Sequence, residues 1–178
     1  MIVYIWQVFM GLIIRETNEN DAYDTASVHV SSWQSAYSGI IPDEVLQSFN
    51  IEKQAERFIN DYKEYKGISF YYVAELDGKI IGNLVISRCS DDDKPKAGEI
   101  IAIYLLEEYW GKRYGYAMLI HAIEVLKNIE CNEVIIWVLE ENDRARRFYE
   151  KCGFTHDGVN KEINIGKQLI ELRYSMML

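Results

Sequence analysis

Four segments decide the fold of this chain: EIIAIYL at 99–105, WGKRYGYA at 110–117, EVIIWVL at 133–139 and NDRARRFYEKCGF at 142–154. The first and third are short apolar runs rich in β-branched residues, which is typical of buried strands. The second turns the chain into an apolar-periodic helix that is predicted to run to about residue 129. The fourth predicts a short helix that Asn142 caps and a glycine ends.

The turn at 110–117 is a candidate phosphate-binding site. Backbone N–H groups at a helix N-terminus are unpaired and carry partial positive charge. Gly111 and Gly115 would let the backbone approach an anion closely. The glycines taken alone favour the simpler interpretation, a tight turn. The residue types of a Walker A loop or a dinucleotide-binding fingerprint are absent.

The fourth segment carries a more specific pattern, because residues 142–154 match Asn-x-x-Ala-x-x-Phe-Tyr-x-x-x-Gly-Phe in full. Together with the turn, it resembles the acyl-CoA-binding core of the GNAT superfamily of N-acetyltransferases. The pyrophosphate loop of that family reads Gln/Arg-x-x-Gly-x-Gly/Ala. Trp110, Arg113 and Gly115 are the aligned residues here, so only the last glycine is retained. Arg113 would be strained if its position needs a positive φ, although its guanidinium could pair with phosphate.

The resemblance implies a GNAT-like α/β domain over residues 12–178, preceded by an apolar N-terminal extension at 1–11. The expected sheet is central, mixed, mostly antiparallel and twisted, with about seven strands, flanking helices and a splay between its two central parallel strands. The remaining sequence predicts a strand at 12–15, helices at 18–37, 42–49 and 51–62, and closing strands at 155–160 and 168–174. An Asp-Gly pair predicts a hairpin of 69–75 with 79–87.

The amino-acid composition limits the expected kinds of binding partner and cofactor. A net charge of −9 disfavours nucleic acid and anionic membranes, and it suits a cationic substrate such as an amine. Negative charge also simply keeps a protein soluble. Three cysteines without ligand-like spacing indicate a reducing, cytoplasmic setting, and three scattered histidines predict no metal. The apolar residues 1–10 lack signal-peptide features; they are either an added segment that could serve a homodimer contact, or they precede a natural start at Met10.

Acetyl transfer to an amine needs a base, because a lysine-like amine with a pKa of about 10.4 is protonated at neutral pH. It also needs an N–H donor for the tetrahedral intermediate and an acid for the departing thiolate. The resemblance implies Tyr149 as the acid and Glu99 as the base. An aromatic core residue at 149 and a solvated, inert glutamate at 99 are the alternatives.

The resemblance also implies that acetyl-CoA binds as co-substrate. The backbone of Ile103, Tyr104 and Leu105 would pair with the pantetheine amides. The phosphates would meet the loop residues Gly111, Lys112, Arg113, Tyr114, Gly115, Tyr116 and Ala117. The amide of Asn142, which caps its helix in any case, would hydrogen-bond the pantetheine or its neighbourhood. Arg144, Arg146 and Arg147 are expected to form a solvated face, with one of them available to a CoA phosphate.

Trp33 and Tyr37 belong to a Trp-x-x-x-Tyr-x-Gly-Ile-x-Pro pattern seen in some family members near the acceptor cleft. They could hold a cationic amine by cation–π attraction, or they could simply pack in the core. The predicted function is acetyl transfer to a small-molecule or peptide amine by direct attack in a ternary complex, since Cys152 has no visible histidine partner for a covalent route. A non-catalytic acyl-CoA-binding or regulatory module is the alternative.

Overall fold

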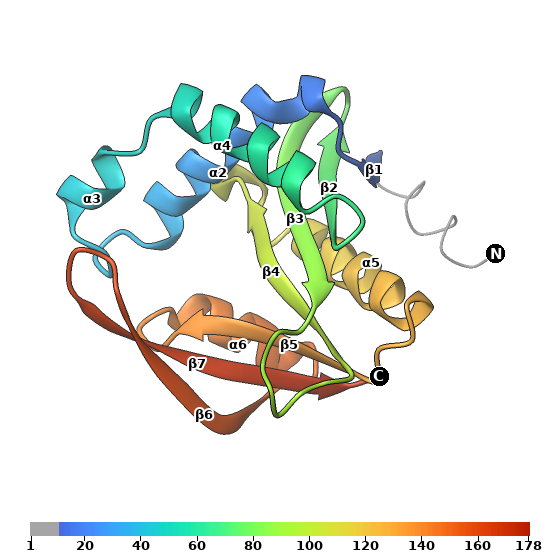
Figure 1. The fold of residues 1–178 in the computed structure, drawn as a ribbon. Coiled ribbons are helices and arrows are strands. Elements are labelled where there is room, and N and C mark those ends of the chain that lie inside the picture. Colours follow the sequence, from blue (N-terminus) through green and yellow to red (C-terminus); the bar gives the residue numbers. More distant parts are fainter. Residues whose placement is uncertain (1–10) are drawn as a thin grey trace.

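Seven strands form one mixed sheet, in the order β1-β2-β3-β4-β5-β7-β6, in the computed structural model, which describes residues 11–178 (Figure 1). Only the β4–β5 pair is parallel, and every other neighbouring pair is antiparallel. The mixed, mostly antiparallel sheet that the sequence predicts is therefore confirmed. The strands are β1 (Leu12–Glu16), β2 (Ser69–Leu76), β3 (Lys79–Arg88), β4 (Ala97–Leu105), β5 (Glu133–Leu139), β6 (Thr155–Asn164) and β7 (Gln168–Met177).

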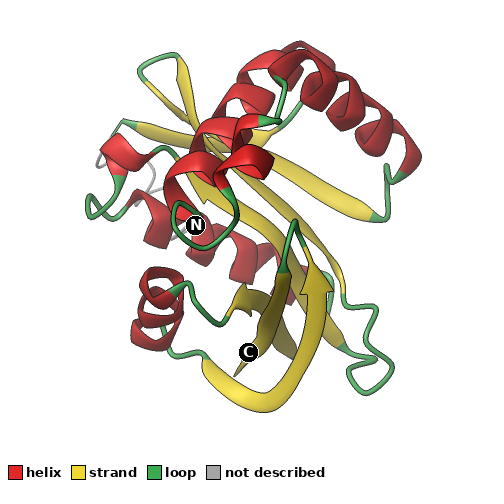
Figure 2. Cartoon of the chain, turned by 90° about the vertical axis from the view of Figure 1, so that its left-hand side faces the viewer, coloured by secondary structure: helices red, strands yellow, loops and turns green. Residues whose placement is uncertain are grey.

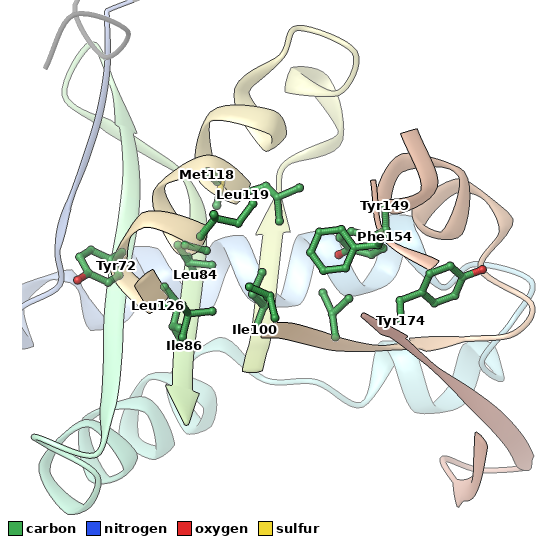
Figure 3. Packing of buried hydrophobic residues seen from close by; sticks show 14 of the residues in the cluster. Tyr72, Leu84, Ile86, Ile100, Met118, Leu119, Leu126, Tyr149, Phe154 and Tyr174 are labelled. Atoms are coloured by element: carbon green, nitrogen blue, oxygen red, sulfur yellow. The ribbon is translucent and has the colours of Figure 1, made fainter. Parts of the chain in front are cut away.

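Helices cover both faces of the sheet (Figures 1 and 2). On one face, Val28 of α2 packs against Val73 and Ile80. On the other, α5 and α6 cover a large apolar core in which Leu119 and Tyr149 are buried (Figure 3). The helices are α2 (Ala22–Ala36), α3 (Asp43–Gln47), α4 (Ile51–Glu64), α5 (Tyr114–Asn128) and α6 (Asp143–Lys151), with 3-10 turns η1 (Glu19–Asp21) and η2 (Glu107–Tyr109).

The two central parallel strands separate after a short pairing. β4 and β5 are in register only from Ala97 with Glu133 to Glu99 with Ile135. On its other side, β4 continues to pair with β3 as far as Leu105. The end of β4 therefore has backbone groups without a sheet neighbour on the β5 side, which is the predicted splay.

Local signals place the ends of several elements. The side chain of Asn142 caps α6 by accepting from the N–H of Ala145 at 3.1 Å, and the chain leaves that helix through Gly153 at a φ of 95°. Asp77 and Gly78 both have positive φ in the β2–β3 turn, as a tight hairpin requires.

The closing strands are longer than predicted. β6 reaches Asn164 and β7 reaches Met177, whereas the sequence predicts ends at 160 and 174. β6 is an edge strand with almost every residue exposed, so it lacks the apolar alternation by which a strand is recognised in sequence. The predictions for residues 1–10, including a homodimer contact, lie outside the described residues.

Candidate active site

A cavity of about 1320 Å³ opens where β4 and β5 separate. It brings together the end of β4, the loop before α5 and the inner face of α6. Most of the predicted cofactor residues line it: Ile103, Tyr104, Leu105, Gly111, Arg113, Gly115, Tyr116, Ala117 and Asn142. Lys112 and Tyr114 do not line it and lie instead beside the ring of Tyr109.

The loop before α5 has the form of an anion site. The first hydrogen bond of α5 runs from the N–H of Ala117 to the carbonyl of Arg113 at 3.0 Å. The N–H groups of residues 114–116 therefore have no helical partner. Arg113 has a φ of 67°, in the left-handed region, so this position does require the conformation that a glycine adopts freely.

We expect Arg113→Gly to raise the free energy of unfolding of the ligand-free protein by up to about 1 kcal/mol. The left-handed conformation costs an L-residue about 1–2 kcal/mol, and only part of this gain is offset by the greater freedom of glycine in the unfolded chain. Urea denaturation measures the difference. Lys112→Gly is the matched control, because Lys112 has no positive φ and should lose stability. Equal destabilisation by both changes would contradict this account.

Trp110 and Arg144 form a stacked pair at the cavity wall. The indole N–H of Trp110 donates to the carbonyl of Leu105 at 2.8 Å. The guanidinium carbon of Arg144 lies 3.2 Å from the centroid of the Trp110 ring. The sequence-based assignment of Arg144 to a solvated face is therefore incomplete, since this residue is exposed but also lines the cavity. The stacking of Arg144 on Trp110 depends on the packing of α6 beside the loop before α5, which the sequence alone does not reveal.

Tyr149 is both a core residue and a wall of the cavity. It is 6% exposed and packs edge-on against Phe148. On its other side it packs edge-on against Phe154 (Figure 3). Burial raises the pKa of its phenol above the ordinary value, so the group stays protonated and able to donate a proton. Within residues 11–178 its hydroxyl takes part in no hydrogen bond. A role as general acid and a role as aromatic core residue are thus compatible for Tyr149.

An aromatic cluster lies between α2 and β4. Trp33 stacks on His29 at 5.5 Å and meets Tyr37 edge-on at 4.9 Å. The hydroxyls of Tyr37 and Tyr104 lie 3.4 Å apart. Burial lowers the pKa of His29 to about 4, so this ring is neutral at physiological pH. Trp33 therefore packs in this cluster and also lines a second, smaller cavity, while Tyr37 lines both cavities.

A second cavity of about 230 Å³ adjoins the first, and Tyr37, Ile101, Tyr104 and Trp137 line both. Glu99 lines this smaller cavity. Its carboxyl is partly buried, and burial raises its pKa, assisted by the negative charges of Asp91 and Glu171 and opposed by the positive charge of Lys161. Glu99 is therefore not the fully solvated glutamate that was the alternative.

Sequence reasoning missed three charged or aromatic residues that line the smaller cavity: Trp137, Lys161 and Glu171. They come from three different strands, and only the register of β5, β7 and β6 places them on one face. Cys152 lines the larger cavity, and burial raises the pKa of its thiol, which disfavours the reactive thiolate.

Neither a metal centre nor a membrane-crossing helix is found in the described part of the chain. No three His, Cys, Asp or Glu side chains within residues 11–178 gather closely enough to hold a metal ion. No helix in this range has the length and apolar composition needed to cross a bilayer.

Comparison with known proteins identifies the family. Residues 32–154 match the model of the acetyltransferase (GNAT) family. An uncharacterized N-acetyltransferase of Bacillus subtilis (strain 168), YuaI, is 30% identical over 129 residues, which cover 72% of this chain and 72% of the relative. A spermidine N(1)-acetyltransferase of Thermoplasma acidophilum is 26% identical over 148 residues, covering 82% of this chain and 89% of the relative.

A solved structure has the same fold. The crystal structure of the PaiA N-acetyltransferase of Thermoplasma acidophilum, in complex with coenzyme A, superimposes with a TM-score of 0.76 at 23% identity. The match covers 95% of this chain and 100% of that chain. The family match spans more than half of the sequence, so this chain belongs to the GNAT family of acetyltransferases and is an acyltransferase.

Proposed function

We propose that the protein transfers the acetyl group of acetyl-CoA to a primary amine of a small molecule or peptide, by direct attack in a ternary complex. The observation that carries this proposal is the pair of adjoining cavities at the β4–β5 splay. The larger one has the volume for a cofactor-sized ligand, and the smaller one offers carboxylates and aromatic rings to a cationic acceptor. The coenzyme A bound in the structural neighbour supports acetyl-CoA as the donor, and spermidine in the name of one relative supports an amine as the acceptor.

Acetyl-CoA would lie along the larger cavity. The unpaired N–H groups at the start of α5 would bind the pyrophosphate, and Arg113 and Arg144 would add positive charge beside it. The free backbone of Ile103 to Leu105 would pair with the pantetheine amides in the place that a neighbouring strand would take. An N–H group of this segment, that of Tyr104 or Leu105, would stabilise the oxyanion.

The chemistry then needs two proton transfers by protein side chains and the loss of one further proton to solvent. Glu99, directly or through a water molecule, takes a proton from the ammonium of the acceptor, and the neutral nitrogen attacks the thioester carbon. The nitrogen of the tetrahedral intermediate still carries one surplus proton, which passes to solvent as the intermediate collapses and the C–S bond breaks. Tyr149 donates its proton to the departing sulfur, and the products are the N-acetylated amine and coenzyme A with a free thiol. Both residues are then restored by exchange of protons with solvent.

Release of the coenzyme A thiol tests the proposal. The assay uses acetyl-CoA with a panel of polyamines, aminoglycosides, amino acids and short peptides. Turnover with one class of amine would establish the reaction and identify that class. Binding of acetyl-CoA without thiol release on any amine would instead favour a non-catalytic acyl-CoA-binding module.

The role of Glu99 predicts a specific pH dependence. A base acts in its deprotonated form, and the pKa of Glu99 is raised, so kcat/KM should fall with decreasing pH at a higher pH than an ordinary glutamate would give. Glu99→Gln should lower kcat/KM about 100-fold at neutral pH and remove this acid limb. Glu162→Gln, an exposed change on β6, is the control and should alter neither. An unchanged acid limb in Glu99→Gln would exclude Glu99 as the base.

A further inference from the structure

The smaller cavity contains a cation that the protein itself supplies. The register of the C-terminal strands pairs Lys161 with Glu171 across β6 and β7, and Glu171 with Leu139 across β7 and β5. Trp137 lies two residues before Leu139 and therefore on the same face of the sheet. These three side chains, Lys161, Glu171 and Trp137, all line the cavity that Glu99 lines.

The ammonium group of Lys161 lies between a carboxylate and an aromatic face. Its nitrogen is 3.3 Å from an oxygen of Glu171 and 3.9 Å from the centroid of the Trp137 ring. An anionic oxygen on one side and a π face on the other is the environment that proteins use to bind ammonium groups. We call this place, formed by Glu171 and Trp137, the ammonium seat.

Lys161 can leave this seat at little cost. It stands on the edge strand β6, and its side chain is 46% exposed, so its flexible stem has open solvent beside it. An exposed lysine–carboxylate pair is only weakly stabilising, because water solvates and screens both charges. Glu171 is less exposed, at 22%, and stays in the wall of the cavity.

The carboxylate of Glu99 faces the same space without a partner of its own. No hydrogen bond or ion pair between residues 11–178 involves it, whereas Glu171 is paired with Lys161. The cavity therefore offers two carboxylates, of which one is neutralised by an internal cation. An acceptor with two amino groups would satisfy both at once, one at Glu99 and one in the ammonium seat.

We propose that the ammonium seat binds a second ammonium group of the acceptor, that Lys161 occupies this seat in the absence of acceptor, and that the preferred acceptors are diamines or polyamines. This inference rests on the proposed function for the reaction at Glu99. It assigns a specificity role to Glu171 and Trp137, and to Lys161 the role of an internal competitor that a cationic acceptor displaces.

Isothermal titration calorimetry measures the affinity of amines for the ammonium seat and does not depend on turnover. Diaminoalkanes of increasing length and the monoamine butylamine are titrated into the protein saturated with coenzyme A. Lys161→Met keeps an apolar stem and removes the competing charge, so we expect the best diamine to bind about threefold to tenfold more tightly and butylamine to be unchanged. Lys161→Arg keeps a competing cation and should behave like the wild type.

A double variant tests the carboxylate of the ammonium seat, and a variant at a distant lysine is its control. Adding Glu171→Gln to Lys161→Met should remove the advantage of diamines over butylamine, because the carboxylate of the seat is gone. Lys167→Met is the matched control: Lys167 pairs with Glu141 at 3.3 Å, a contact of the same kind outside both cavities, so diamine binding should not change.

The outcomes separate this inference from the proposed function. Unchanged or weaker diamine binding in Lys161→Met, or an equal gain for butylamine, would overturn the seat, even if thiol release proves the enzyme active. The expected binding pattern without thiol release on any diamine would leave the seat in place and overturn the proposed reaction. A melting curve for each variant confirms that it is folded.

Discussion

Replacing Tyr149 with Phe is expected to lower kcat about 100-fold while leaving the dissociation constant of acetyl-CoA unchanged. General acid catalysis contributes about 10²–10⁴ in rate, and the phenolic hydroxyl is the only group removed. Burial keeps the pKa of this hydroxyl above its ordinary value, so the acid is protonated throughout the neutral and mildly alkaline range. Phe fills the same space beside Phe148 and Phe154, so the core should remain intact.

Tyr174→Phe is the matched control for this change. Tyr174 is also buried, but its hydroxyl donates to Glu150 at 2.8 Å and accepts from Arg146, outside both cavities. Loss of this hydroxyl should cost about 1 kcal/mol of stability and leave kcat unchanged. Steady-state thiol release and calorimetry of acetyl-CoA binding give the two quantities. Full activity of Tyr149→Phe would assign this tyrosine to packing alone.

The largest effect on stability is expected from Arg173→Met, which should lower the free energy of unfolding by about 3 kcal/mol. Arg173 lies on β7 with its side chain only 3% exposed. Its guanidinium donates two hydrogen bonds to Asp93, at 2.6 and 2.8 Å, and one each to Asp91 and Asp157. Removing the cation leaves three carboxylates near one another, of which Asp157 keeps an ion pair with Lys94 at 3.8 Å and Asp93 is 59% exposed.

The effect of Arg173→Met should depend on pH. The guanidinium holds the pKa of Asp93 below its usual range. A carboxyl group whose pKa is lower in the folded state stabilises the protein at pH values above its unfolded-state pKa. This stabilisation is lost as the pH falls through the folded-state pKa. The difference between wild type and variant should therefore be full near neutral pH and shrink in acid.

Urea denaturation at several pH values measures this difference. Arg147→Met is the control, because Arg147 is exposed and its ion pair with Asp143 is 3.9 Å long, so the change should cost less than about 1 kcal/mol. A loss in Arg173→Met no larger than that of the control would show that the ion pairs of Arg173 contribute little to stability.

The elements around the site were predictable because their signals are local. Runs of β-branched residues marked β4 and β5, and an Asp-Gly pair marked the β2–β3 turn. Asn142 and Gly153 marked the two ends of α6. Each signal depends on residues a few positions apart, whose spacing is set by helix or strand geometry. The C-terminal end of β6 was missed, since an exposed edge strand has no apolar alternation to reveal it.

The sequence by itself determined the family, the order of strands and helices along the chain, and the placement of Tyr149 and Asn142 in one capped helix. Only the tertiary structure decided which side chains share a space. Arg173 and Asp91 are separated by 82 residues, and the seat of Glu171 and Trp137 arises from the pairing of β5 with β7. Such contacts depend on strand register and on helices packing across the sheet, which are properties of the whole folded chain and leave no pattern in neighbouring residues.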